Sequence, residues 1–136
     1  MPAAHQPAIT DLLFVYGTLM QGFDNPYART LNEQSHFVGA GSLPGSLYRV
    51  DWYPGAVPDA SASTRIYGEV YQLYNSAEIL RFLDDYEEVR PDGTGLYVRK
   101  ALPVQVGPNQ LICWTYVYNQ SVANLVMIEG GRWSKE

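Results

Sequence analysis

Glycine and proline interrupt this chain so often that it has little room for long helices. Its 136 residues include 12 Gly and 9 Pro, and turn-forming pairs such as Pro44-Gly45 and Pro54-Gly55 crowd residues 38–60. Eleven tyrosines add side chains that favour strands. The pattern predicts short strands joined by tight turns. Within the turn-rich segment we expect one short strand, over residues 46–50.

Apolar and alternating runs predict the rest of the sheet. Residues 107–109, Gly-Pro-Asn, lie between two long runs of strand-forming residues and predict a hairpin connection. Gly68 lies inside an alternating run, where a missing side chain allows close approach of another group. The further strands that we expect cover residues 12–16, 66–73, 96–106 and 111–118.

Two segments predict helices. Asn25 followed by Pro26 is typical of a helix start, and we expect a short helix that ends near residue 31. Residues 75–88 form the clearest amphipathic segment, in which Asn75 and Glu78 resemble a capping box. The order of strands and helices predicts an α+β domain with a mixed or mostly antiparallel sheet, able to curl into a small barrel with short flanking helices.

Length and composition limit the class of protein. Apolar residues make up 46% of the chain and charged residues 17%, which fits one ordinary core and excludes a disordered chain. We expect one domain over residues 11–120, between a flexible N-terminus, 1–10, and a C-terminal tail, 121–136. Residues 121–136 on their own are ambiguous between a short helix or turn and a polar tail.

Charge and targeting signals exclude several partners. The net charge is −5 and no basic cluster occurs, which argues against a nucleic-acid or anionic-membrane partner. No apolar run approaches the roughly 20 residues that span a bilayer. Residues 1–10 lack the charged and apolar regions of a secretory signal. We therefore expect a cytoplasmic protein without a membrane partner, and the sequence leaves its oligomeric state open.

Metal ligands and thiol nucleophiles are scarce. Cys113 is the one cysteine, so an intramolecular disulfide and a cysteine-based metal site are excluded, and its alternating strand predicts a buried thiol. His5 and His36 have no partners that the sequence can assign, and we expect both at the surface. We predict no metal and no cofactor.

One carboxylate of the 75–88 helix lies on an unexpected face. At about 100° per residue, the apolar side chains fall in one arc and most of the acidic ones on the opposite face. Glu87 falls between Leu80 and Leu83, with the apolar stripe. Burial there would raise its pKa, as suits a general acid/base near neutral pH. The alternatives are that the helix frays before Glu87, or that Glu87 pairs with Arg90 or Arg99.

A second candidate feature follows the first predicted strand. Residues 16–19, Tyr-Gly-Thr-Leu, bring glycine and a small hydroxylated residue to the end of an apolar run. Such a turn can direct consecutive backbone N–H groups toward one point and hold a carboxylate or a developing oxyanion. The alternative is an ordinary tight turn. The chain contains neither GxxxxGK[ST] nor GxGxxG, so it is not a phosphate loop.

Taken in order, these segments resemble the γ-glutamylcyclotransferase-like, or AIG2-like, superfamily. The resemblance spans residues 11–119, and Trp114 to Tyr118 takes the place of that family's last strand. One departure is Glu88, where many members have glycine. The matching segments are residues 14–19 (FVYGTL), 45–48 (GSLY), 53–55 (YPG), 66–71 (IYGEVY), 83–87 (LDDYE), 97–99 (YVR) and 114–118 (WTYVY).

The resemblance implies a small barrel with flanking helices and a cavity at its mouth. It also implies an enzyme that releases 5-oxoproline from γ-glutamyl amines or related isopeptides, with Glu87 as the catalytic glutamate. Its substrate-binding residues would be Tyr16, Gly17, Thr18, Leu19, Tyr53, Pro54, Gly55, Tyr97 and Tyr118. From the residues alone Tyr97 and Tyr118 are ordinary strand tyrosines, and Tyr53 to Gly55 form a turn.

Two further readings of the same cavity stay open. A non-catalytic module could bind a small amino-acid-like ligand, with Glu87 as an ion-pairing group. An interaction domain without a ligand would make Glu87 a structural residue. Fold alone does not choose among these functions, but a glutamate at the family's catalytic position favours the enzyme and a small-molecule γ-glutamyl substrate.

Overall fold

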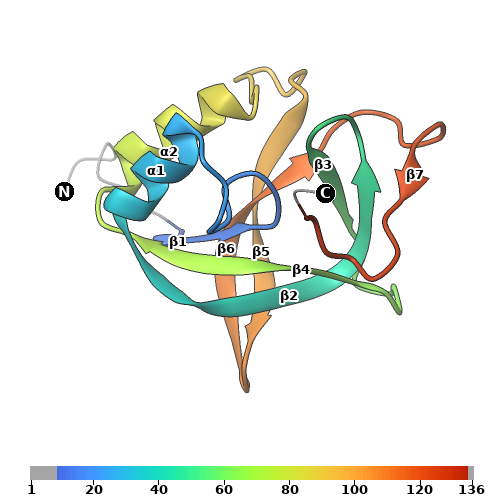
Figure 1. The fold of residues 1–136 in the computed structure, drawn as a ribbon, viewed down its shortest axis with the longest axis horizontal. Helices are drawn as coiled ribbons and strands as arrows, with labels where there is room; N and C mark the ends of the chain where they lie inside the picture. Colours follow the sequence, from blue (N-terminus) through green and yellow to red (C-terminus); the bar gives the residue numbers. More distant parts are fainter. Residues whose placement is uncertain (1–8, 135–136) are drawn as a thin grey trace.

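A computed structural model describes residues 9–134. Strands dominate it, and two short helices lie at one end (Figure 1). The elements are β1 (Leu12–Val15), α1 (Pro26–Glu33), β2 (Ser35–Arg49), β3 (Pro54–Pro58), β4 (Arg65–Leu73), α2 (Ser76–Tyr86), β5 (Tyr97–Val106), β6 (Asn109–Tyr118) and β7 (Val126–Met127). The predicted flexible segment and His5 fall in residues 1–8, outside the described residues. None of the described helices is long and apolar enough to cross a membrane.

Five strands close into a mixed barrel, as the sequence predicted. The strand order is β2-β4-β1-β6-β5, and the ring closes where Ser42 of β2 pairs with Gln105 of β5. All of these pairings are antiparallel except that of β1 with β6, which is parallel. The β5–β6 hairpin extends from the side of the barrel opposite the helices (Figure 1).

The prediction that strands in residues 38–60 are short was wrong for β2, a single strand of 15 residues, of which the strand expected over residues 46–50 is only the last part. Its glycines serve close packing and bending instead of chain reversal. A Cβ on Gly41 would lie 2.9 Å from Val104 of β5 and 3.0 Å from Val70 of β4. A bulge between Phe37 and Gly39 bends the strand, which pairs with β4 up to Pro44 and with β3 from there on.

The two helices start and end close to the predicted positions. Asn25 caps α1 by accepting a hydrogen bond from the Ala28 N–H at 2.8 Å. Asn75 is the N-cap of α2, but its side chain makes no capping hydrogen bond, so the predicted capping box does not form. The Tyr27 ring stacks on Phe82 and Tyr86, with centroids 4.7 and 4.2 Å apart, and joins the helices.

Residues 121–134, assigned to a tail from the sequence, lie against the barrel. β7 pairs with β2, and the Gly131 carbonyl accepts a 2.9 Å hydrogen bond from the Tyr67 N–H. Trp133 is buried in the same core cluster as Phe14, beneath the guanidinium of Arg49. Cys113 lies in the same cluster as a buried free thiol, as predicted.

Candidate active site

The loop of residues 16–19 leaves β1 at the end of the barrel that faces the helices. A Cβ on Gly17 would lie 2.8 Å from the Pro54 ring, so glycine is needed here for close approach and not for a left-handed backbone. The Asn25 side chain holds the loop by donating to the Thr18 carbonyl at 2.9 Å. The backbone N–H groups of Gly17, Thr18 and Leu19 donate no hydrogen bond to any residue within 9–134. They are free to bind a ligand.

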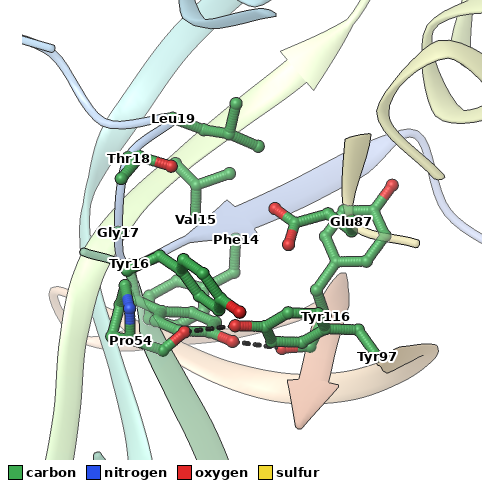
Figure 2. Close-up of a pocket in the computed structure, with 11 residues that line it drawn as sticks. Phe14, Val15, Tyr16, Gly17, Thr18, Leu19, Pro54, Glu87, Tyr97 and Tyr116 are labelled. Atoms are coloured by element: carbon green, nitrogen blue, oxygen red, sulfur yellow. Dashed lines mark hydrogen bonds between the residues drawn. The ribbon is translucent and has the colours of Figure 1, made fainter. Parts of the chain in front are cut away.

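Glu87 is the C-cap of α2, directly after the last helical residue. Its backbone N–H donates to the Leu83 carbonyl at 2.9 Å, which continues the helix far enough to aim the side chain inward. The carboxylate points toward residues 16–19 (Figure 2). Burial, followed by the negative charge of Asp84, raises the pKa of Glu87 from 4.5 to about 8.

The carboxylate of Glu87 has no hydrogen-bond or ion-pair partner among residues 9–134, and the pairing alternatives are wrong. Arg99 instead binds Asp84, with Nε 2.7 Å from Oδ1 and a second N–H donating to Oδ2 at 3.1 Å. The Tyr116 hydroxyl donates to the same Oδ1 at 2.7 Å. Asp84 therefore accepts three hydrogen bonds, whereas the Glu87 carboxylate accepts none from residues 9–134.

The Glu87 carboxylate borders a small inner pocket of about 30 Å³. This volume has room for about one or two water molecules or a carboxylate group. The Tyr16 hydroxyl donates to the Tyr116 carbonyl at 2.5 Å, and the Tyr97 hydroxyl donates to the Pro54 carbonyl (Figure 2). Burial raises the pKa of both phenols. These two hydrogen bonds therefore link Tyr16 to β6 and β5 to β3, and both tyrosines line the pocket.

A larger outer pocket of about 260 Å³ adjoins the inner one and shares Thr18, Tyr53, Glu87 and Tyr97 with it. The Thr18 hydroxyl lies 2.6 Å from the Tyr86 hydroxyl at its rim. The two pockets thus form one site with a narrow inner end and a wider opening, and Glu87 stands where they meet.

The structure brings together eight of the ten site residues expected from the sequence. The inner pocket is lined by Tyr16, Gly17, Thr18, Leu19, Tyr53, Pro54, Glu87 and Tyr97. Gly55 and Tyr118 line neither pocket. A Cβ on Gly55 would lie 2.7 Å from the Tyr118 ring, and that ring packs edge-on against Tyr97 at 5.6 Å. These two residues support the pocket wall from behind.

Several lining residues were missed in the sequence. Tyr116 shares a strand face with Tyr118, and the alternation of β6 could have identified it. Trp52 and Glu88 reach the outer pocket from a turn and a helix end, for which the sequence has no periodic signal. The other missed residues are Phe14 and Val15 in the inner pocket and Tyr86 and Leu96 in the outer one.

Metal-ligating side chains do not gather anywhere in the part of the chain that the structure describes: no three His, Cys, Asp or Glu groups come together there. His36 is exposed on β2, away from both pockets. Both pockets instead share one carboxylate with a raised pKa, that of Glu87.

The closed barrel thus carries a carboxylate with a raised pKa beside two connected pockets at one end. A model of the family "Gamma-glutamyl cyclotransferase, AIG2-like" matches residues 13–135. The chain belongs to this family.

Sequence and structure relatives agree with this assignment. The chain is 32% identical to the γ-glutamylcyclotransferase family protein YtfP of Citrobacter rodentium, over 89% of this chain and 93% of the relative. The solution structure of Escherichia coli YtfP superimposes with a TM-score of 0.61 at 33% identity, over 90% of this chain and 95% of that one. Bacillus subtilis YkqA gives a TM-score of 0.70 at 26% identity, over 92% of this chain but only 40% of that longer one.

Proposed function

We propose that this protein converts a γ-glutamyl amine or isopeptide to 5-oxoproline and a free amine. The observation that carries the proposal is the Glu87 carboxylate: half-buried between two pockets, without a hydrogen-bond partner among residues 9–134, and directed at a loop with unpartnered N–H groups. A largely desolvated carboxylate without a partner is costly unless it performs a function. The chain's membership of the γ-glutamyl cyclotransferase family supports the same reaction type.

The reaction is an intramolecular aminolysis. The substrate's α-amino nitrogen attacks its own γ-carbonyl carbon and forms a five-membered lactam, while the bond from that carbon to the leaving nitrogen breaks. Glu87 takes one proton from the α-ammonium before the attack and delivers it to the leaving nitrogen. The second proton, which the attacking nitrogen loses after the attack, is taken up by the released amine, which departs as an ammonium, so protons balance over the cycle. A carboxylate whose pKa is near 8 can both accept and return a proton near neutral pH.

The two pockets divide the substrate. The inner pocket, with the N–H groups of residues 17–19, would hold the negatively charged oxygens of the glutamyl unit and of the tetrahedral intermediate. Holding that unit folded brings the amine close to the carbonyl, which supplies much of the rate. The leaving amine would extend into the outer pocket.

The test is incubation of the purified protein with γ-glutamyl amines, γ-glutamyl dipeptides and γ-glutamyl-lysine, with 5-oxoproline measured by mass spectrometry. We expect turnover by the wild type and a loss of at least about 100-fold in Glu87→Gln, because an amide cannot accept the ammonium proton. Acetylating the substrate's α-amino group should abolish the reaction.

Three outcomes would contradict the proposal. Release of glutamate would indicate a hydrolase, and turnover of the acetylated substrate would exclude the α-amino group as nucleophile. Binding of all these compounds without any turnover by the wild type would indicate a binding module.

A further inference from the structure

The outer pocket combines acidic residues with aromatic walls. Its lining contains Glu87 and Glu88 and four aromatic residues, but no lysine, arginine or histidine. Glu88 supplies the negative charge, because the folded protein keeps a proton on Glu87 near neutral pH. Trp52 is 63% exposed at the rim and packs edge-on against Tyr53, with ring centroids 5.0 Å apart. Electron-rich ring faces and carboxylates both attract cations.

The backbone of Glu88 is held in an unusual conformation. Its φ is +52°, the one positive φ found among the described residues other than glycine. Glycine is the usual residue at this position, just past a helix C-cap, because a Cβ disfavours the left-handed region. The Glu88 carbonyl accepts a 3.0 Å hydrogen bond from the Leu96 N–H, which fixes the residue at the pocket wall.

Glu88 forms no ion pair with any residue in the part of the chain that the structure describes. The two ion pairs between described residues are Arg29–Asp24 and Arg99–Asp84, and neither includes Glu88. Its charge also reaches the pocket, because it is one of the groups, after burial, that raise the pKa of Tyr53. The net charge of −5 adds to the attraction for a cation.

We propose that Glu88 determines specificity for leaving amines that carry a second positive charge, so that the preferred substrates are γ-glutamyl conjugates of diamines or polyamines. This inference rests on the proposed function, which places the leaving amine in the outer pocket. The distal ammonium would lie between the Glu88 carboxylate and the aromatic rim. A leaving group that ends in a carboxylate would be repelled by the same residue.

The experiment compares three γ-glutamyl conjugates of similar size: that of 1,5-diaminopentane, that of hexylamine and that of 6-aminohexanoate. We expect the wild type to prefer the first over the second by about ten-fold in kcat/KM, and to use the third least. Glu88→Gln keeps the side chain's size and removes its charge, and it should reduce the ten-fold preference to near unity. Asp85→Asn removes a charge at the same helix end but outside both pockets, and should leave the ratio unchanged.

Two additions keep the result decisive. Glu88→Gly suits the left-handed backbone, so it should fold even where Glu88→Gln does not, and it should lose the preference equally. Calorimetric binding of the diamine and hexylamine conjugates to Glu87→Gln measures the same preference without turnover. Absence of turnover by the wild type would overturn the proposed function, whereas equal binding of the two conjugates, or a ratio that survives loss of Glu88, would overturn this inference.

Discussion

At the residue scale, Asp84 has surroundings different from those of Glu87, although the two residues lie one helical turn apart. Asp84 is bound by Arg99 and Tyr116, and its charge is the second cause, after burial, of the raised pKa of Glu87. We therefore expect Asp84 to act through Glu87, as a positioning residue.

In a plot of kcat/KM against pH, the rise at low pH reports the loss of the Glu87 proton. We expect Asp84→Asn to move this rise to lower pH. The substitution removes the negative charge of Asp84 and leaves the positive charge of Arg99 unbalanced. Both changes favour the ionised form of Glu87. Burial remains, so the pKa should stay above its ordinary value. The measurement is a pH–rate profile from pH 5 to 10.

The matched control is Tyr116→Phe. It removes a hydrogen bond to Asp84 but keeps the carboxylate, and should leave the rise in place. A rise that does not move in Asp84→Asn would show that Asp84 does not tune Glu87.

The positions of these residues show which features could be predicted from the sequence. A helical wheel predicted that Glu87 lies on the apolar face of its helix, because helical geometry depends only on neighbouring residues. The partner of Arg99 was not predictable, since Asp84 and Glu87 lie one turn apart and only the paired strands show which carboxylate the guanidinium reaches. The reason for a glycine at position 17 could not be predicted either. It is the close approach of Pro54, which lies 37 residues away at the start of β3.

At the element scale, strands and helix ends with local signals were predicted and the long strand was not. Residues 12–16, 66–73 and 111–118 alternate or run apolar, and each corresponds to an observed strand within a few residues. The length of β2 was missed because its glycines resemble turn signals, whereas Gly41 lets Val104 and Val70 pack against the backbone. That contact joins residues more than 25 positions apart, which no local pattern reveals.

The two helix N-caps form a natural matched pair. Asn25 caps α1 and also holds the Thr18 carbonyl, while Asn75 makes no side-chain capping bond. We expect Asn25→Ala to lower the free energy of unfolding by about 1–2 kcal/mol and to weaken substrate binding, because the loop of residues 16–19 loses its anchor. Asn75→Ala should change the stability by less than about 0.5 kcal/mol. Urea unfolding and calorimetric binding measure both effects, and equal losses in the two variants would contradict this assignment.

At the scale of the whole molecule, closing the barrel is what assembles the site. β1 supplies the loop, the start of β3 supplies Pro54, and the end of α2 supplies Glu87; these three segments are distant in sequence. The parallel pairing of β1 with β6 places Tyr116 beneath the loop. The family resemblance predicted this barrel, but the division into an inner and an outer pocket depends on side chains that only the closed structure brings together.

Enclosing Glu87 also has a consequence for stability. Its pKa is about 8 in the folded protein and about 4.5 when exposed. Between these values the unfolded chain has lost the Glu87 proton and the folded protein keeps it, so stability falls as pH rises through this window and levels off above it. Glu87→Gln has no such titration. We therefore expect its stability advantage over the wild type to grow from pH 5 to pH 8, to at least about 1 kcal/mol, or about 3 °C in Tm.

Thermal unfolding of the two proteins at several pH values between 5 and 9 tests this expectation. Glu78→Gln serves as the control, because Glu78 is exposed on α2 and lines neither pocket. Its replacement makes the same chemical change at a residue outside the site. Its difference from the wild type should stay constant over this range. A pH-independent difference for Glu87→Gln as well would mean that the folded protein does not hold a proton on Glu87, and the acid/base role proposed for that residue would lose its physical basis. If only the stability difference between Glu87→Gln and the wild type grows with pH, then the Glu87 carboxyl is the group that destabilises the barrel near neutral pH. It is also the group proposed to move the proton.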